Sequence, residues 1–256
     1  MPGVFQKFKE SRFAKGLIYA IVGACSYPGL NIINKLEING MEKLKNLPKQ
    51  NVLFVSNHQT YFADVITFIH IFCAVYWRKK HKLGIPYYLL WPFTRIKYVA
   101  AEETMKSTWI SRLFCVAGAV TVRRTWREDG QEIRRSLDTS DVRKIENALA
   151  KNWVITFPQG TTKPFAPGRK GTAFIIKQHR PVVIPVVITG FWRAFNKKGL
   201  KLKKRGTLLS VTFKDPMVID YEDSCENILE QVMDAIEQSK KYMIKGRHHL
   251  ISTMDK

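Results

Sequence analysis

From residue 51 onward, short runs of apolar and β-branched residues alternate with longer segments of helical length. The short runs have the length of strands and lie at residues 51–57, 96–103, 119–124, 153–160, 181–191 and 208–213. The longer segments are predicted to be helices and lie at residues 63–77, 107–119, 131–152 and 224–246. Strands that alternate with helices need crossover connections, which favour parallel pairing. The pattern therefore predicts an α/β fold with a largely parallel mixed sheet flanked by helices.

Residues 1–45 differ from the rest because they mix lysines and arginines with large apolar side chains. Their uncharged stretch, Gly16 to Asn34, is of borderline length for a spanning helix, and Pro28 interrupts it. We therefore expect an N-terminal segment of helices that lies in a membrane interface, with basic residues toward lipid phosphates. A signal peptide and a soluble amphipathic helix packed on the domain are the two alternatives.

The remaining residues, 46–256, fit one globular domain. A chain of 256 residues that is 45% hydrophobic and 25% charged can build one sizeable core and does not require two. The sequence shows no internal repeat, low-complexity segment or domain linker. Its four cysteines have neither paired nor metal-ligand spacing, which favours a reducing compartment over a disulfide framework.

The formal net charge of +21 indicates an anionic partner. Nucleic acid, acidic phospholipid and phosphorylated small molecules all have the required charge. The basic residues are spread along the chain, and no recognised nucleic-acid-binding module is present, so we expect no nucleic acid. Together with the N-terminal segment, the charge favours an anionic membrane surface, and we expect association with the cytoplasmic face of a membrane.

Polar clusters follow three of the predicted strands. They are SNHQTYFAD at residues 56–64, RRTWRED at 123–129 and FPQGTTKPFAPGRKG at 157–171. In an α/β sheet the ends of the strands face a crevice, and the helices that begin there offer unpaired amides. The three clusters are therefore the candidates for a functional site.

These clusters occur in a recognisable order. Asn57 and His58 followed by Asp64, then GAVTVRR, FPQGTTKPFAPGRKGTAF and VVIPVVI, resemble the four sequence blocks of the glycerolphosphate acyltransferase superfamily, which includes lysophosphatidic acid acyltransferases. The resemblance covers residues 50–190, approximately. It implies transfer of a fatty acyl group from an acyl thioester, acyl-CoA or acyl-ACP, to a hydroxyl of a lysophospholipid such as 1-acylglycerol-3-phosphate or a related lipid acceptor.

The chemistry of such a transfer fits two of these residues. A hydroxyl attacks a thioester only when a base removes its proton, and a histidine of near-neutral pKa suits that role. His58 is the candidate base, and Asp64 is the candidate that orients it and stabilises the imidazolium. The resemblance implies substrate binding by Asn57, Arg124, Gln159, Gly160, Thr161 and Arg169. It implies neither a metal nor a cofactor beyond the thioester, with acyl carrier protein as a possible donor partner.

The sequence departs from the superfamily pattern in two places. Five residues separate His58 from Asp64 where the superfamily has four, and one extra residue on a regular helix would rotate the carboxylate by about 100°. The pair can still meet if the extra residue lies in the loop before the helix. In the third block, Gln159 and Thr162 replace a glutamate and an arginine, which indicates a different acceptor.

Each candidate also has a structural explanation. His58 could be a loop residue whose hydrogen bonds are made within the protein. Asp64 could be a carboxylate that stabilises a helix N-terminus, and Gly160 could be a turn residue. The alternative function is then a non-catalytic basic peripheral protein that binds anionic lipid or nucleic acid. Acceptor-dependent loss of an acyl thioester distinguishes the enzyme from this alternative.

Overall fold

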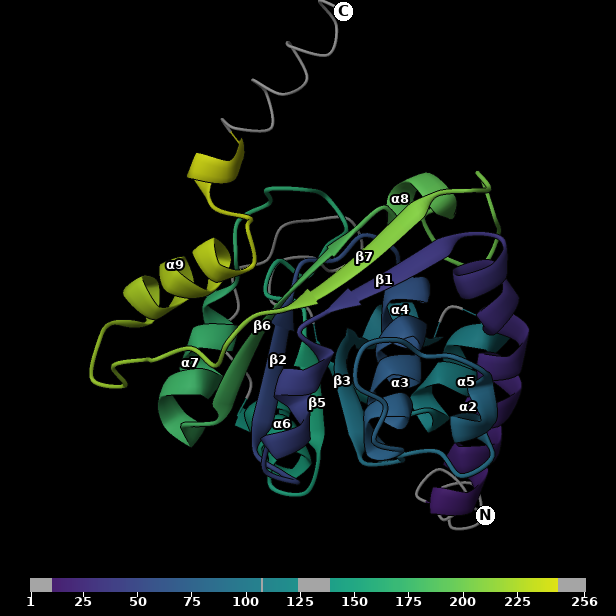
Figure 1. Cartoon of the computed structure of the whole chain (residues 1–256). Coiled ribbons are helices and arrows are strands. Elements are labelled where there is room, and N and C mark those ends of the chain that lie inside the picture. Colours follow the sequence, from purple (N-terminus) through teal and green to yellow (C-terminus); the bar gives the residue numbers. More distant parts are fainter. Residues whose placement is uncertain (1–10, 107, 124–138, 244–256) are drawn as a thin grey trace, which may run out of the picture.

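The computed structural model describes residues 11–106, 108–123 and 139–243 of the chain (Figure 1). Within these residues seven strands form one sheet in the order β1-β7-β6-β2-β5-β3-β4. Neighbouring strands are parallel except β6 and β7, which are antiparallel. The predicted fold class is confirmed. The strands are β1 (Lys35–Asn39), β2 (Val52–Ser56), β3 (Ile96–Ala101), β4 (Ala119–Val122), β5 (Trp153–Thr156), β6 (Val182–Thr189) and β7 (Leu208–Phe213).

Helices cover both faces of the sheet (Figure 1). One face carries α2 (Arg12–Tyr27), α3 (Ala63–Tyr76) and α5 (Trp109–Val116). The other carries α6 (Thr139–Leu149), α7 (Lys170–His179) and α9 (Cys225–Ala235). Shorter elements are the π-helix η1 (Pro28–Ile32), the 3-10 helices η2 (Met41–Asn46) and η3 (Pro86–Leu89), and the helices α4 (Glu102–Lys106) and α8 (Phe191–Ala194).

The central strands read as continuous apolar runs because both of their faces are buried. On β2, Phe54 joins the core under α3, whereas Leu53 and Val55 join the core under α7 and α9. Successive strand side chains point to opposite faces, so a strand covered on both sides needs apolar residues throughout. The chemistry of the chain is therefore confined to the ends of these strands.

Helix α3 is buried on all sides because α2, η2, η3 and the sheet enclose it. Every residue from Ala63 to Val75 is buried. The buried histidine of this helix, His70, contacts Ser26 Oγ through Nε2 at 2.9 Å and Tyr88 Oη through Nδ1 at 2.9 Å. Burial lowers the pKa of His70 to about 4, so this side chain is neutral at physiological pH. It ties α2 and η3 to the core.

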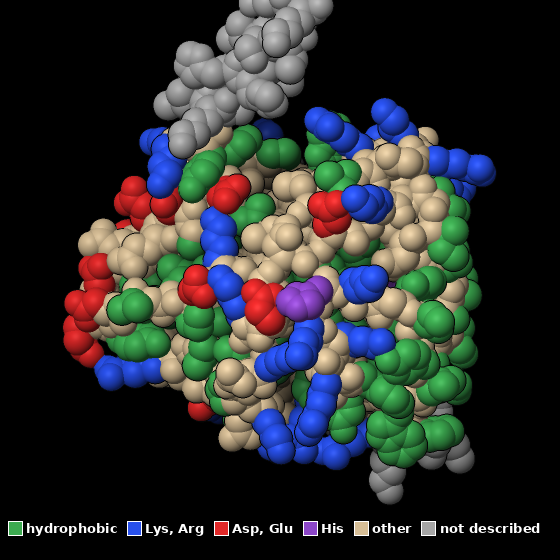
Figure 2. Space-filling view, in the orientation of Figure 1, with side chains coloured by type: hydrophobic (Ala, Val, Ile, Leu, Met, Phe, Trp, Pro, Cys, Tyr) green, Lys and Arg blue, Asp and Glu red, His purple; other side chains and the backbone are tan. Residues whose placement is uncertain are grey.

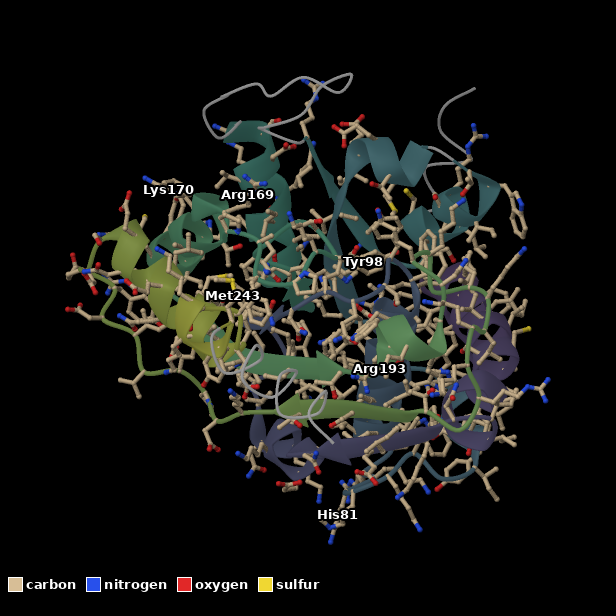
Figure 3. The ribbon with its side chains drawn as sticks, turned by 90° about the horizontal axis from the view of Figure 1, so that it is seen from above. His81, Tyr98, Arg169, Lys170, Arg193 and Met243 are labelled. Atoms are coloured by element: carbon tan, nitrogen blue, oxygen red, sulfur yellow. The ribbon has the colours of Figure 1, made fainter. Side chains whose placement is uncertain are left out.

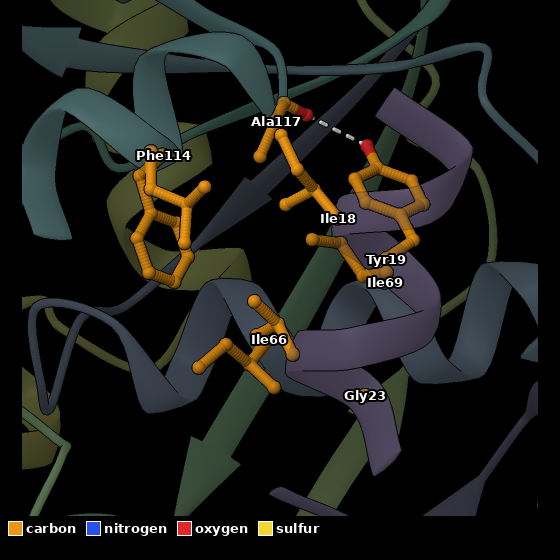
Figure 4. A pocket seen from close by; sticks show the side chains of 9 residues that line it. Ile18, Tyr19, Gly23, Ile66, Ile69, Phe114 and Ala117 are labelled. Carbon is orange, nitrogen blue, oxygen red and sulfur yellow. Dashed lines mark hydrogen bonds between the residues drawn. The ribbon is translucent and has the colours of Figure 1, made fainter. Parts of the chain in front are cut away.

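The inner face of α2 is fastened to the sheet and to α5. Tyr19 donates a hydrogen bond of 2.8 Å to the Ala117 carbonyl, across a cavity of about 10 Å³ (Figure 4). The buried Lys15 ammonium donates to the carbonyls of Thr94 and Ile96, and burial lowers its pKa. The outer face of α2 is left to solvent. In the described residues, no helix is both long enough and apolar enough to cross a bilayer.

The structure differs from the predicted elements at residues 35–39 and 102–103 and at the ends of two helices. Residues 102–103, expected to end a strand, begin helix α4 instead. Residues 35–39, assigned to the helical segment, form the edge strand β1, which pairs with β7. The last helix, expected to reach residue 246, is interrupted after Ala235, where Glu237 takes a left-handed conformation with φ of 60°. The helix expected at 131–152 is seen as Thr139–Leu149, and residues 131–138 lie outside the described residues.

Candidate active site

Described residues of all three polar clusters, Arg123 alone from the second, line one cavity at the carboxyl ends of the parallel strands. The cavity has a volume of about 580 Å³ and is lined by the loops after β2 and β5, by the ends of β3 and β4, and by the start of α7. In the view from above, Arg169 and Lys170 lie on the α7 side and Tyr98 on the β3 side (Figure 3). Convergence of loops from several parallel strands is the usual location of a reactive site in an α/β sheet.

His58 and Asp64 form a hydrogen-bonded pair at this cavity. His58 Nδ1 lies 2.8 Å from Asp64 Oδ2. The Asp64 side chain is fully buried, and that of His58 is 12% exposed and lines the cavity. Because Nδ1 is used by the carboxylate, Nε2 is the ring nitrogen left for a substrate hydroxyl.

The extra residue between His58 and Asp64 is accommodated in the loop before α3. Asp64 stands in the first turn of the helix, and Gln59, Thr60, Tyr61 and Phe62 precede the helix. The loop turns its donors toward the carboxylate: Asp64 Oδ2 accepts from Gln59 N at 2.6 Å and Thr60 N at 3.0 Å, and Oδ1 accepts from Thr60 Oγ1 at 2.7 Å. These donors satisfy a carboxylate that would otherwise be costly to bury. The insertion therefore leaves the pair intact.

Aromatic rings fix the plane of the His58 imidazole. The Phe157 ring stacks on it with a centroid separation of 3.9 Å and an interplanar angle of 20°, and the Tyr61 ring lies 6.3 Å away. Phe157 follows β5, whereas His58 follows β2, so the pairing of the two strands brings the rings together. The Asp64 hydrogen bond and the stacked ring together hold one orientation of the base.

Two of the candidate substrate-binding residues turn away from the cavity. Asn57 donates from Nδ2 to the Ile188 carbonyl at 2.8 Å and accepts from Ile188 N at 2.8 Å, so its amide is occupied by strand β6. Gln159 is buried and donates to Ala166 O at 3.0 Å and to Gln238 Oε1 at 3.3 Å. Both amides hold the loops that form the cavity.

Three other candidates line the cavity, and one lies outside the described residues. Gly160, Thr161 and Arg169 are in the cavity wall, and Gly160 has a left-handed φ of 62°. Arg124 falls in the segment 124–138, which the structure does not describe. The sequence reading missed Lys170, a further cation in the wall, whose pKa is raised by its exposed partner Glu226.

Much of the cavity wall is apolar, which the sequence could not show. The apolar side chains of the wall come from α3, α4, α5, α6, α7 and the sheet and include Phe62, Val65, Val99, Met105, Phe114, Val142, Ile145 and Ile175. In the sequence each of them is indistinguishable from an ordinary core residue, because the wall of a cavity and the core have the same composition. Among the described residues, no three His, Cys, Asp or Glu side chains gather as metal ligands would.

A second groove lies at the opposite end of the sheet. It has a volume of about 1200 Å³ and is lined by the start of α2, the end of α3, and the residues that precede β2, β3 and β5, including Phe13, Trp91, Arg95 and Trp153. None of its lining residues belongs to the polar clusters that follow the strands. The smaller cavity is therefore the one that contains the candidate chemistry.

Comparison with known proteins concerns the family and the fold of the chain. The family model described as Acyltransferase matches residues 35–189. The fold is similar to the crystal structure of the 1-acyl-sn-glycerophosphate (LPA) acyltransferase PlsC from Thermotoga maritima, with a TM-score of 0.51 and 19% sequence identity over 93% of this chain and 83% of that chain. At that identity the similarity concerns the fold alone. No curated protein matches the chain.

Proposed function

The chain belongs to the acyltransferase family, within the glycerolphosphate acyltransferase superfamily, and on this basis we propose a specific reaction. It transfers a fatty acyl group from acyl-CoA or acyl-ACP to the hydroxyl of a lysophospholipid such as 1-acylglycerol-3-phosphate or a related lipid acceptor. The supporting observation is the His58 Nδ1–Asp64 Oδ2 hydrogen bond of 2.8 Å beside a cavity whose lining combines many apolar side chains with the cations Arg169 and Lys170.

In the proposed mechanism His58 is the general base. Its Nε2 accepts the proton of the acceptor hydroxyl as the oxygen attacks the thioester carbonyl carbon. Asp64 accepts the Nδ1–H hydrogen bond and stabilises the imidazolium that forms. When the tetrahedral intermediate collapses, the carbon–sulfur bond breaks and His58 returns the proton to the leaving thiolate. The products are an ester and a free thiol, and the enzyme returns to its starting protonation state.

The walls of the cavity suit the fatty acyl chain and the phosphate group of the proposed substrates. The apolar side chains, which include Phe62, Val65 and Ile145, provide a surface for a fatty acyl chain. Arg169 and Lys170 stand at the amino end of α7 and line the same cavity, where both cations and helix amides favour a phosphate. Gly160 and Thr161 complete this wall. Asn57 and Gln159 act through the loops that they hold.

We place the enzyme at the surface of a membrane, on its cytoplasmic face. The exposed face of α2 carries Phe13, Leu17 and Ile21, which are 82%, 51% and 56% exposed. A helix with such a stripe, close to basic residues, is suited to lie in the headgroup region of a bilayer. In this proposal the exposed face of α2, within residues 1–45, attaches the acyltransferase domain to the membrane.

A thioester assay tests the proposed function. Purified full-length protein is incubated with labelled acyl-CoA or acyl-ACP and a panel of lysophospholipids, and ester formation is measured. Ester that forms only in the presence of an acceptor supports the proposal, and the most active acceptor and donor identify the substrates. Binding of anionic lipid without loss of thioester would instead show a non-catalytic peripheral protein.

A further inference from the structure

The connection between β6 and β7 is a basic hairpin, which we define as residues 191–206. It contains α8 and a short antiparallel turn in which Phe195 bridges Leu202. Its sixteen residues include seven cations and no acidic residue: Arg193, Lys197, Lys198, Lys201, Lys203, Lys204 and Arg205. All seven are exposed. The hairpin lies beyond the region that matches the family model, which ends at residue 189.

Apolar side chains are exposed among these cations. Trp192 is 52% exposed, and Leu200 and Leu202 are each 41% exposed. An indole and two leucines beside seven cations form an amphipathic surface of the kind that enters the headgroup region of a bilayer. This combination of cations and exposed apolar side chains suits a partner whose surface has an anionic layer above an apolar layer.

Buried side chains and hydrogen bonds hold the hairpin in one conformation. Phe191, Ala194 and Phe195 are buried beneath it. Asn196 closes the turn, since its side chain accepts hydrogen bonds from Leu200 N at 3.1 Å and Lys201 N at 3.2 Å. A surface that is already ordered loses little conformational entropy when it binds.

The basic hairpin continues the exposed apolar stripe of α2. The stripe runs through Phe13, Leu17 and Ile21, and the exposed Ile32 lies farther along the chain in η1. At that end, Gly29 lies against the Phe195 ring of the hairpin. Figure 2 shows hydrophobic side chains along the α2 edge of the molecule and Lys and Arg side chains above them, over α8 and the β6–β7 connection. The two features form one continuous surface.

We propose that the basic hairpin docks on an anionic phospholipid surface and thereby turns the catalytic cavity toward the membrane. Its cations contact lipid phosphates, and Trp192, Leu200 and Leu202 enter the headgroup region. Charge complementarity selects the anionic lipid, and the exposed apolar side chains favour a bilayer over an acidic protein partner. The orientation of the cavity, though not the docking itself, rests on the proposed acyl transfer.

The hairpin touches the loop that carries the catalytic pair. Tyr61 N donates to Lys197 O at 3.1 Å, and Phe62 N donates to Lys198 O at 3.0 Å. The Lys197 ammonium lies 5.8 Å from the Tyr61 ring, and Tyr61 lines the cavity. A lipid surface held by the hairpin is therefore close to the cavity wall, where a lipid acceptor has to enter.

Vesicle binding by full-length variants tests the proposal. Lys201→Gln/Lys204→Gln/Arg205→Gln removes three hairpin cations whose side chains have no catalytic assignment. The matched control, Arg143→Gln/Lys151→Gln/Lys240→Gln, removes the same charges from exposed positions elsewhere on the surface. Sedimentation is measured with vesicles of phosphatidylcholine alone and with added phosphatidylglycerol. Each cation near an anionic surface contributes roughly fivefold in affinity, so the hairpin variant should bind anionic vesicles about 100-fold more weakly.

The control variant should keep most of its affinity, and both variants should acylate a soluble short-chain acceptor at the wild-type rate. Equal weakening of the two variants would overturn the proposal, because net charge and not the hairpin would then govern binding. Unchanged vesicle binding with a loss of activity only for acyl-ACP would also overturn it and would indicate a carrier-protein dock. If wild-type protein acylates no acceptor, the proposed function fails, and the vesicle result still decides the docking.

Discussion

At the scale of single residues, the candidate site depends on a carboxylate that is fully enclosed by donors. Asp64 accepts from His58, from the amides of Gln59 and Thr60, and from the Thr60 hydroxyl. Three of these four donors belong to the loop that holds the extra residue. The same contacts therefore stabilise the loop and orient the imidazole, so a change at Asp64 affects both folding and proton transfer.

Replacing His58 with alanine should lower the turnover number about 10²–10⁴-fold, the range expected for removal of a general base. The Michaelis constant for the acyl donor should change little, because His58 is assigned to the acceptor proton. Steady-state kinetics measures both constants, and a thermal melt shows that the variant is folded. A folded His58→Ala protein with near wild-type turnover would contradict the assignment.

Asp64→Asn should reduce turnover less than His58→Ala, because the base remains and only its orientation and charge support are lost. The new amide would also place N–H donors opposite donors of the loop, which should lower the free energy of unfolding by about 1–3 kcal/mol. Urea unfolding measures that loss. Thr60→Val, which removes a single donor to the carboxylate, is the matched control and should cost about 1 kcal/mol.

At the scale of elements, the sequence predicted the buried strands well and the tertiary hydrogen bonds poorly. The run 208–213 was predicted with the observed bounds of β7, because every second side chain of this strand, Leu209, Val211 and Phe213, is apolar and buried. Strand β1 was missed, since its short alternating sequence carries little local signal and β7 supplies its pairing. The early end of α9 depends on Gln238, which accepts from Phe165 N at 2.9 Å and from Gln159. Such distant partners are invisible in local patterns.

The same contrast between local patterns and contacts to distant residues applies to the candidate site residues. His58 and Asp64 were proposed from the resemblance to the superfamily blocks and from their chemistry, and the structure shows that the two side chains are hydrogen-bonded. The amides of Asn57 and Gln159 were assigned to substrate, whereas the structure shows them bonded to Ile188 and Gln238, far along the chain. A polar side chain in a loop has the same sequence signature whether it faces a cavity or a distant backbone group.

Gly199 provides a test of how the basic hairpin supports the catalytic loop. Its φ is +76°, and an added Cβ would lie 2.5 Å from Ala63 N and 2.9 Å from Thr60 Oγ1. Gly199→Ala should therefore displace the loop around Asp64 and lower the turnover number. Gly206→Ala is the control, because its φ is +65° and an added Cβ meets nothing within 4 Å.

Both glycine variants carry the cost of a left-handed alanine, about 1–2 kcal/mol. Any additional loss in Gly199→Ala comes from its contact with the catalytic loop. Turnover and thermal stability are measured for both proteins. Equal effects of the two substitutions would show that the hairpin does not support the loop.

His70 makes the packing of α2, α3 and η3 sensitive to acid. Its pKa of about 4 in the folded protein lies below the ordinary value of about 6.5, so the unfolded chain binds a proton more readily. The stability from neutral His70 is complete above pH 6.5 and is lost as the pH falls toward 4, by about 3 kcal/mol in total. Urea unfolding between pH 7 and pH 4.5 should show a shallower loss in His70→Gln than in wild type. Identical slopes would place the acid sensitivity elsewhere.

At the scale of the whole molecule, the proposed membrane-binding surface combines the basic hairpin with the apolar stripe of α2. The cavity opens where the parallel strands end, and the basic hairpin projects from the same end. Helix α2 runs along the side of the molecule and brings the apolar stripe next to the hairpin (Figure 1, Figure 2). We therefore propose that binding through both features turns the cavity toward the lipid headgroups.

Removal of the N-terminal residues would be a poor test of anchoring. Strand β1 pairs with β7, and Tyr19 of α2 is buried against Ala117, so a truncation would damage the core as well as the stripe. Substitutions on the exposed face of α2 avoid this problem. Phe13→Ser/Leu17→Ser/Ile21→Ser changes side chains that are at least half exposed. Val218→Ser, at a position that is 97% exposed on another part of the surface, is the control.

Salt separates the two contributions to membrane binding. Cations of the hairpin are screened as the ionic strength rises, whereas burial of Phe13, Leu17 and Ile21 in the bilayer is not. Wild-type binding to anionic vesicles should therefore weaken with salt and level off at a residual affinity. In the α2 triple variant that residual affinity should fall at least about tenfold, because the lost apolar contact is worth a few kcal/mol. Complete release of wild-type protein by high salt would mean that the stripe does not enter the bilayer and that charge alone holds the protein there.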